Sequence, residues 1–233
     1  MSQSTAAGGP VGGPPGPKGM NALREPTYRL IEPVTQWLIR RRVHPNAITI
    51  AGFVVTVAGA LMYSRDHVHI AGLLVLLGGL CDVFDGRVAR VSGLASKFGN
   101  FFDSTLDRIS EIAMYLGLMT LYNAYQLRFI DIWMIYIIAL ALGGSLMVSY
   151  TRAKAESLGF DCSVGLMQRG ERILLLGLGS LIFGWGWNGT VLTSLIVIVA
   201  VLTNATAVQR MFWVYRHGKG VPLDGGGDAS GKA

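Results

Sequence analysis

The sequence predicts an all-α, polytopic membrane protein with six transmembrane helices and an amphipathic helix in front of them. Hydrophobic residues make up 51% of the 233-residue chain and charged residues only 15%, whereas a soluble domain carries about 25% charged residues. The apolar segments are too long and too numerous for the interior of one or two soluble domains. The net charge of +6 does not indicate nucleic-acid binding, because no basic helix or basic–aromatic interleaving accompanies it.

The predicted domain organisation is a central membrane domain between two tails. Residues 1–20 are rich in Gly and Pro and lack the apolar stretch of a secretory signal, so we expect a disordered tail. Residues 21–44 have apolar side chains at three- and four-residue intervals opposite a charged face. This pattern predicts an interfacial amphipathic helix, kinked or broken at Pro33. Residues 45–216 form the predicted six-helix domain, and residues 217–233 a flexible C-terminal tail.

Six apolar segments follow one another in the membrane domain, and each predicts one transmembrane helix. They are Asn46–Ser64, His69–Val91, Ala95–Leu121, Phe129–Tyr150, Arg172–Trp187 and Thr190–Tyr215. With the N-terminus inside, the outer loops hold two of the twenty Lys and Arg residues, Arg65 and Arg128. The positive-inside rule therefore places both termini in the cytoplasm, and we expect a multi-pass protein of the inner (plasma) membrane.

Four aspartates lie in the second and third of these segments. Asp82 and Asp85 are near the inner end of one predicted helix, and Asp103 and Asp107 near the inner end of the next. Residues three or four apart share a helix face, so the carboxylates converge at one depth. An unpaired carboxylate at the centre of a membrane helix costs about 2.5–3.5 kcal/mol, so something must compensate it. Such oxygen ligands suit Mg²⁺ or Mn²⁺, and two ions of this kind are a common arrangement for displacement at phosphorus.

Small and basic residues accompany the aspartates. Gly86 and Gly99 leave the backbone open beside the carboxylates, and Ala89 keeps its helix face open. Arg90 places a planar cation with several hydrogen-bond donors where phosphate oxygens would bind. These residues predict a site that a bulky phosphorylated ligand can approach closely.

The spacing from Asp82 to Asp107 resembles the signature of the CDP-alcohol phosphotransferases, D-x2-D-G-x2-A-R-x8-G-x3-D-x3-D, at every fixed position. The family's helical layout is similar over roughly residues 26–216. The resemblance implies that an alcohol attacks the lipid-side phosphorus of CDP-diacylglycerol and that CMP leaves. It implies that the four aspartates bind two metal ions and that Asp107 is also the general base.

The same resemblance implies which residues contact the donor. The turn after the first aspartate pair and the start of the first span match further nucleotide contacts of the family. The residues implied to bind the CDP-lipid are Asn46, Thr49, Gly86, Ala89, Arg90, Ser96 and Gly99. A homodimer is a further expectation from the family.

A second group of basic residues provides a candidate binding site for the acceptor alcohol. Four cations flank one short cytoplasmic loop between the fourth and fifth predicted helices: Arg152, Lys154, Arg169 and Arg172. They could simply anchor the chain by the positive-inside rule. Alternatively, an antiparallel helix pair would bring them together level with the aspartates, where they would bind a phosphate on the acceptor.

The stretches around these cations resemble one branch of the family. Residues 149–156 and 168–172 are similar to segments of phosphatidylinositol phosphate synthases and archaetidylinositol phosphate synthases, although Gln168 and Gly170 depart from the pattern. This implies myo-inositol 1-phosphate as acceptor and phosphatidylinositol phosphate as product. Glycerol 3-phosphate, the acceptor of a phosphatidylglycerophosphate synthase, also carries a phosphate and is the alternative acceptor. A cation- or proton-coupled transporter would explain the intramembrane acids but not the glycines and arginine between them.

Overall fold

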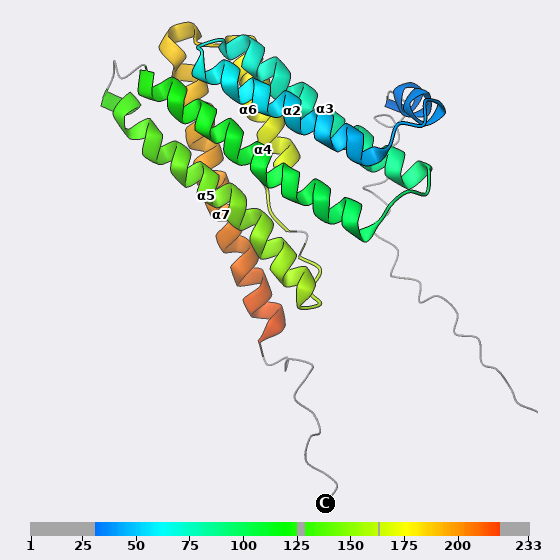
Figure 1. Cartoon of the computed structure of the whole chain (residues 1–233). Coiled ribbons are helices and arrows are strands. Elements are labelled where there is room, and N and C mark those ends of the chain that lie inside the picture. Colours follow the sequence, from blue (N-terminus) through cyan, green and yellow to red (C-terminus); the bar gives the residue numbers. More distant parts are fainter. Residues whose placement is uncertain (1–30, 125–128, 163, 220–233) are drawn as a thin grey trace, which may run out of the picture. The chain divides into compact units, whose positions relative to one another are not determined.

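The computed structural model describes residues 31–124, 129–162 and 164–219, and all regular secondary structure in these ranges is helical (Figure 1). The predicted all-α class is therefore confirmed for this part of the chain. The helices after residue 43 are α2 (Pro45–Ser64), α3 (Val68–Val91), α4 (Lys97–Ala124), α5 (Phe129–Ser157), α6 (Arg169–Phe183) and α7 (Thr190–Gly218). A 3₁₀ turn, η1 (Gly186–Gly189), precedes α7.

The helix that precedes α2 belongs to a separate compact unit, which ends at Val43. Residues 31–40 are helical, and the side-chain amide of Gln36 donates to Glu32 Oε1 at 2.7 Å, one turn earlier. Pro33 lies in the first described turn of this helix, and the kink or break expected there stays a prediction. The predicted tail over residues 1–20 and the beginning of the amphipathic segment lie outside the described residues.

Local sequence signals set the beginnings of two helices that carry site residues. Pro45 opens α2, where its missing N–H and fixed φ are favourable, and the ring nitrogen Nδ1 of His44 accepts from the Asn46 N–H at 3.2 Å. A capping box begins α6, in which the backbone N–H of Gln168 donates to Glu171 Oε2 at 2.6 Å. Both caps fix the first helical turn beside the site.

Helix α2 lies between α3 and α4 and contacts both. Helix α3 also packs on α6, α4 on α5, and both α5 and α6 on α7. Small residues permit these close contacts, since a side chain at Gly117 would meet the Ala60 backbone and one at Gly72 would meet the backbone of α6. The hydroxyls of Tyr63 and Ser180 form a buried 2.6 Å hydrogen bond between α2 and α6. This packing holds α3 and α4 on either side of the start of α2.

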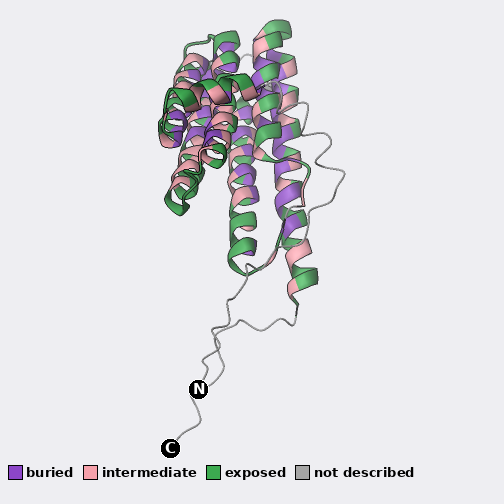
Figure 2. Ribbon diagram, turned by 90° about the vertical axis from the view of Figure 1, so that its right-hand side faces the viewer, coloured by how far each residue is buried: buried purple, intermediate pink, exposed green. Residues whose placement is uncertain are grey.

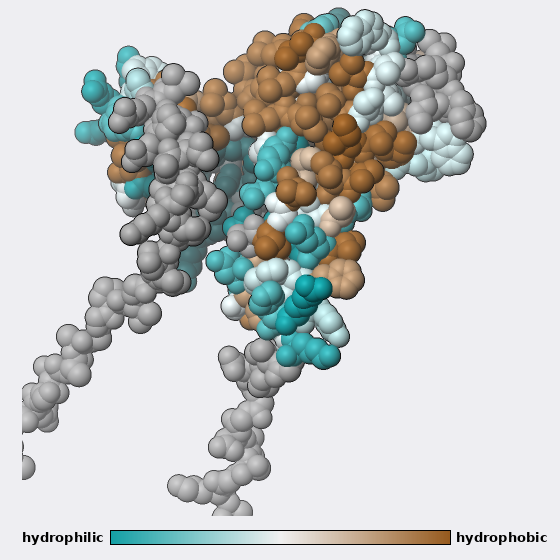
Figure 3. All heavy atoms as spheres, turned by 180° about the vertical axis from the view of Figure 1, so that it is seen from behind, coloured by the Kyte–Doolittle hydropathy of each residue, from teal (hydrophilic) through white to brown (hydrophobic). Residues whose placement is uncertain are grey.

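Apolar side chains also cover much of the outside of the helices. Figure 2 shows exposed residues along the outer helix faces around a buried interior, and Figure 3 shows large apolar areas on the surface. Four helical segments are long and apolar enough to cross a membrane: Pro45–Ser64, Val68–Val91, Ile132–Ser157 and Gly186–Gly218. The chain is therefore a membrane protein with four candidate spans among the described residues.

Two of the six predicted spans, α4 and α6, do not meet the length and composition criteria for a helix that crosses a membrane. Helix α4 has 28 residues but carries several charged side chains in its first half. Helix α6 has only 15 residues, which at about 1.5 Å per residue is shorter than the roughly 30 Å hydrocarbon core. It ends at Phe183 rather than at the predicted Trp187, because Gly184 adopts a φ of 53° that only glycine takes easily.

Candidate active site

Three of the four predicted metal ligands converge between α3 and α4. One oxygen from each of Asp82, Asp85 and Asp103 lies within 4.8 Å of the other two. The first two are one turn apart on α3 and so share a face. Asp103 belongs to the second turn of α4, which the shared packing on α2 brings opposite them. The cluster therefore depends on the short spacing of the aspartates on α3 and on the packing of α3 and α4 against α2.

The chemistry of the cluster fits a hard divalent cation. Asp85 is 4% exposed. Within the described part of the chain, Asp85 Oδ2 and Asp103 Oδ1 are buried and make no hydrogen bond. Buried charged oxygens are normally paired or coordinate a metal. Carboxylate oxygens that converge in this way are the ligands that Mg²⁺ and Mn²⁺ prefer.

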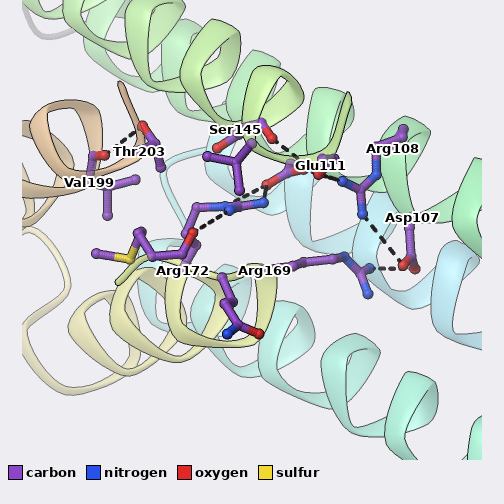
Figure 4. A network of polar contacts seen from close by, with 12 residues as sticks. Asp107, Arg108, Glu111, Ser145, Arg169, Arg172, Val199 and Thr203 are labelled. Carbon is purple, nitrogen blue, oxygen red and sulfur yellow. Dashed lines mark hydrogen bonds and ion pairs between the residues drawn. The ribbon is translucent and has the colours of Figure 1, made fainter. Parts of the chain in front are cut away.

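Asp107 is joined to the cluster through Arg169. The Arg169 guanidinium reaches out from the first turn of α6, with Nη1 2.5 Å from Asp82 Oδ2 and Nη2 2.8 Å from Asp107 Oδ1. Figure 4 shows the contact between Arg169 and Asp107. One planar cation therefore neutralises carboxylates from two different helices.

A cavity of about 170 Å³, here called the smaller cavity, opens beside the carboxylates of Asp85 and Asp103. Its walls come from the start of α2, the end of α3, the following turn and the start of α4. All seven residues predicted to contact the CDP-lipid line it: Asn46, Thr49, Gly86, Ala89, Arg90, Ser96 and Gly99. The structure thus brings together residues that are up to 53 positions apart in the sequence.

Two glycines keep the smaller cavity open. A Cβ atom on Gly86 would lie 3.6 Å from the guanidinium nitrogens of Arg90. A Cβ atom on Gly99 would lie 3.1 Å from Ser96 Oγ and 3.5 Å from Asn46 Oδ1. Any side chain at these positions would therefore occupy space between the polar groups that line the cavity.

A second cavity, of about 740 Å³ and here called the larger cavity, lies between α4, α5, α6 and α7. Of the four predicted acceptor-binding cations, Arg152 and Arg169 line it. The side chain of Arg152 is half exposed and pairs with Glu156 at 2.8 Å. Lys154 is exposed on α5 and is not part of the lining. Its role in binding the acceptor stays a prediction.

Arg172 also lies outside the lining of the larger cavity, in a buried network. It is 1% exposed. Its Nε and Nη2 lie 2.9 and 2.7 Å from Glu111 Oε1 on α4, and its Nη1 donates to the Met167 carbonyl at 3.0 Å. Figure 4 shows Glu111 between Arg172 and Arg108. The predicted contact of Arg172 with the acceptor is not tested by this geometry.

Comparison with known proteins identifies the family. Residues 42–203 match the sequence model of the CDP-alcohol phosphatidyltransferases. The chain belongs to the CDP-alcohol phosphatidyltransferase family. The matched region contains all four aspartates and the lining of the smaller cavity.

Similar members of the family come from archaea and bacteria. The chain is 34% identical to the archaetidylinositol phosphate synthase of Methanothermobacter thermautotrophicus over 197 residues, which cover 84% of this chain and 94% of that one. It is 34% identical to the phosphatidylinositol phosphate synthase of Streptomyces avermitilis over 195 residues, covering 81% and 79% respectively.

Solved structures of this family have the same fold. The phosphatidylinositol phosphate synthase of Mycobacterium tuberculosis with CDP-DAG bound matches with a TM-score of 0.70 and 28% identity, over 88% of this chain and 100% of that one. The same enzyme in complex with manganese and citrate also gives a TM-score of 0.70 at 28% identity, over 85% and 92%. A divalent metal cofactor therefore agrees with both the family and the aspartate cluster.

The structure adds polar residues to the larger cavity that the sequence reading did not assign: Asn100, Ser104, Arg108, Ser149 and Arg210. Arg210 is 2% exposed, donates from Nε to the Val164 carbonyl at 2.7 Å and hydrogen-bonds the Val148 carbonyl. A signal for it was available, because Arg210 is the one arginine in the predicted span Thr190–Tyr215, and an arginine inside a membrane requires partners. Asn100 lines both cavities, and no motif pointed to it.

Proposed function

We propose that this family member transfers a phosphatidyl group from CDP-diacylglycerol to myo-inositol 1-phosphate, forming phosphatidylinositol phosphate and CMP. The observation that carries the proposal is the presence of two cavities, one beside the carboxylates of Asp85 and Asp103 and one lined by Arg169, which contacts Asp82 and Asp107. The smaller cavity holds every residue predicted for the CDP-lipid, and the larger cavity is lined by arginines that suit a phosphorylated acceptor. The relatives named for inositol phosphate lipid synthesis support this choice of acceptor.

In the proposed reaction, the smaller cavity binds the donor. The open backbone at Gly86 and Gly99 admits the nucleotide, and Arg90 pairs with the diphosphate. Asn46 and Thr49, at the start of α2, provide polar contacts from the opposite wall. Two Mg²⁺ or Mn²⁺ ions held by Asp82, Asp85, Asp103 and Asp107 would neutralise the charge that develops on the phosphate oxygens.

In the same proposal, the larger cavity binds and orients the acceptor. Arg152 and Arg169 hold its phosphate, with Lys154 and Arg172 as the further predicted contacts. The acceptor hydroxyl oxygen forms a bond to the lipid-side phosphorus, and the bond from that phosphorus to the bridging oxygen of CMP breaks. The hydroxyl proton passes to a carboxylate oxygen of Asp107, and CMP leaves with the bridging oxygen.

The proposal includes a membrane arrangement. We propose six spans, with α4 and α6 as the two that the apolar criterion misses, and an interfacial amphipathic helix within residues 21–44. The six-helix domain would cover residues 45–216, with tails at residues 1–20 and 217–233. The distribution of Lys and Arg supports cytoplasmic termini, a cytoplasmic active site and an inner-membrane location. A homodimer is part of the proposal on the basis of the family.

The test is CMP release by purified protein in detergent with CDP-diacylglycerol and Mg²⁺. Inositol 1-phosphate, glycerol 3-phosphate, free inositol and serine are compared as acceptors. The Asp107→Asn variant tests the carboxylate, and Asp66→Asn is the matched control. Asp66 is exposed in the turn after α2 and has a φ of 65°, which asparagine adopts readily.

We expect CMP release with inositol 1-phosphate, loss of about 10²- to 10⁴-fold in Asp107→Asn, and no loss in Asp66→Asn. Release with glycerol 3-phosphate instead would keep the reaction class and overturn the acceptor. An ion gradient is not required for this assay, whereas a coupled transporter would depend on one. Full activity of Asp107→Asn would remove that residue from the proposed mechanism.

A further inference from the structure

We infer that Glu111 is a positioning residue that sets the geometry of the acceptor side of the site. This inference rests on the proposed function, because it concerns how the larger cavity binds a phosphorylated acceptor. Glu111 lies on α4 one turn after Asp107 and is 5% exposed. It does not line the larger cavity. A carboxylate so deeply buried must be compensated by cations that are close to it.

The first compensating cation is Arg172. Both Nε and Nη2 of Arg172 contact a single oxygen, Glu111 Oε1, at 2.9 and 2.7 Å. The remaining terminal nitrogen of Arg172 donates to the Met167 carbonyl at 3.0 Å. Met167 immediately precedes Gln168 and Arg169, which line the larger cavity. Glu111 therefore fixes, through Arg172, the chain segment that places Arg169 beside the carboxylates.

The second cation is Arg108. Its Nη1 lies 3.8 Å from Glu111 Oε2, a distance that fits an ion pair rather than a hydrogen bond. Arg108 also pairs with Asp107 Oδ2 at 3.7 Å and donates to Ser149 Oγ on α5. It lines the larger cavity. The single charge of Glu111 therefore lies between two arginines, as Figure 4 shows.

The contacts predict for which substrate the binding depends on Glu111. Arg108, Gln168 and Arg169 line the larger cavity, and none of them lines the smaller one. Without the charge at Glu111, Arg108 and Arg172 lose the anion that compensates both of them. We therefore expect a substitution of Glu111 to weaken the binding of the acceptor and to leave the binding of CDP-diacylglycerol unchanged.

The test compares Glu111→Gln, which keeps the length of the side chain but removes its charge, with Glu111→Asp, which keeps the charge but shortens the reach. Glu32→Gln is the matched control, because it makes the same change at a residue that lines neither cavity. The measurements are KM for inositol 1-phosphate, KM for CDP-diacylglycerol and kcat. The shift in melting temperature caused by inorganic phosphate is a readout that does not require turnover.

We expect KM for inositol 1-phosphate to rise about ten- to a hundredfold in Glu111→Gln, which corresponds to one charge-assisted contact. KM for CDP-diacylglycerol should stay within about twofold, since the smaller cavity is untouched. Phosphate should stabilise the wild type and Glu32→Gln and should stabilise Glu111→Gln much less. If Glu111→Gln does not fold, Glu111→Asp is expected to raise KM for inositol 1-phosphate and to leave KM for CDP-diacylglycerol unchanged.

A purely structural role would lower the melting temperature and the amount of active enzyme but leave both KM values and the phosphate shift unchanged, and that result would overturn the inference. An equal rise in both KM values would overturn it as well. A wild-type enzyme that releases no CMP with any phosphorylated acceptor would instead refute the proposed function. The two failures are therefore distinguishable in the same experiment.

Discussion

Removing Arg169 should tighten the binding of divalent metal even though it lowers activity. The guanidinium contacts Asp82 at 2.5 Å and Asp107 at 2.8 Å, and both are predicted metal ligands. A cation that binds these oxygens must displace or share those contacts. The Arg169→Gln substitution removes the competing charge and keeps a polar side chain of moderate size.

The magnitude follows from the two contacts. A hydrogen bond to a charged group contributes about 1.5–3 kcal/mol net. The side chains of Arg169, Asp82 and Asp107 are 20%, 18% and 14% exposed, so screening by solvent places each contact near the lower limit. Release of one or both contacts corresponds to roughly ten- to a hundredfold tighter binding.

The assay is a titration of metal-free protein with Mn²⁺, in which free Mn²⁺ is followed by electron paramagnetic resonance. Arg152→Gln is the control, because Arg152 lines the same cavity but pairs with Glu156 and not with the aspartates. We expect lower activity in both variants and tighter Mn²⁺ binding in Arg169→Gln alone. Unchanged or weaker Mn²⁺ binding in Arg169→Gln would refute the reasoning.

Three further outcomes are expected. Treatment with a chelator should abolish CMP release, and added Mg²⁺ or Mn²⁺ should restore it; activity that survives complete metal removal would exclude the proposed cofactor. Gly86→Val should raise KM for CDP-diacylglycerol by filling space beside Arg90, whereas Gly143→Val, which meets no atom within 4 Å, should have little effect on the same kinetics. Ser180→Ala should lower the free energy of unfolding in detergent by about 1–3 kcal/mol, because it leaves the buried Tyr63 hydroxyl without its partner. Adding Tyr63→Phe should recover part of that loss, and an unchanged loss would show that the hydrogen bond is not its cause.

The aspartate cluster and the smaller cavity were predictable from sequence because they depend on short, regular spacings. Asp82 and Asp85 need only one helix to share a face, and Asp103 needs only the next helix to return beside it. The residues of the smaller cavity belong to the same two helices or to the start of α2. Helical periodicity and a short turn account for the cavity residues on α3 and α4, whereas Asn46, Thr49 and Ser96 were expected only from the resemblance to the family.

The contacts of the basic residues near the larger cavity were less predictable. They depend on the direction in which each side chain leaves its helix and on how far along the helix it lies. Arg152 and Lys154 are two residues apart, so they cannot face the same way on a continuous helix, and α5 extends to Ser157 instead of ending at the predicted Tyr150. Arg169 and Arg172 share one face of α6, but one reaches the aspartates and the other a buried glutamate. The positive charge alone does not show which arginine contacts which carboxylate, because the partner lies on another helix that is distant in the sequence.

The shared wall at Asn100 has a consequence for inhibition. Because the two cavities have separate linings that meet at this residue, we expect both substrates to be held together before any bond changes. A compound shaped for the larger cavity would then lower the rate at every concentration of the nucleotide lipid, and excess lipid would not displace it. Such a compound would discriminate between enzymes that use different acceptors, because it would occupy the larger cavity and leave the smaller one free.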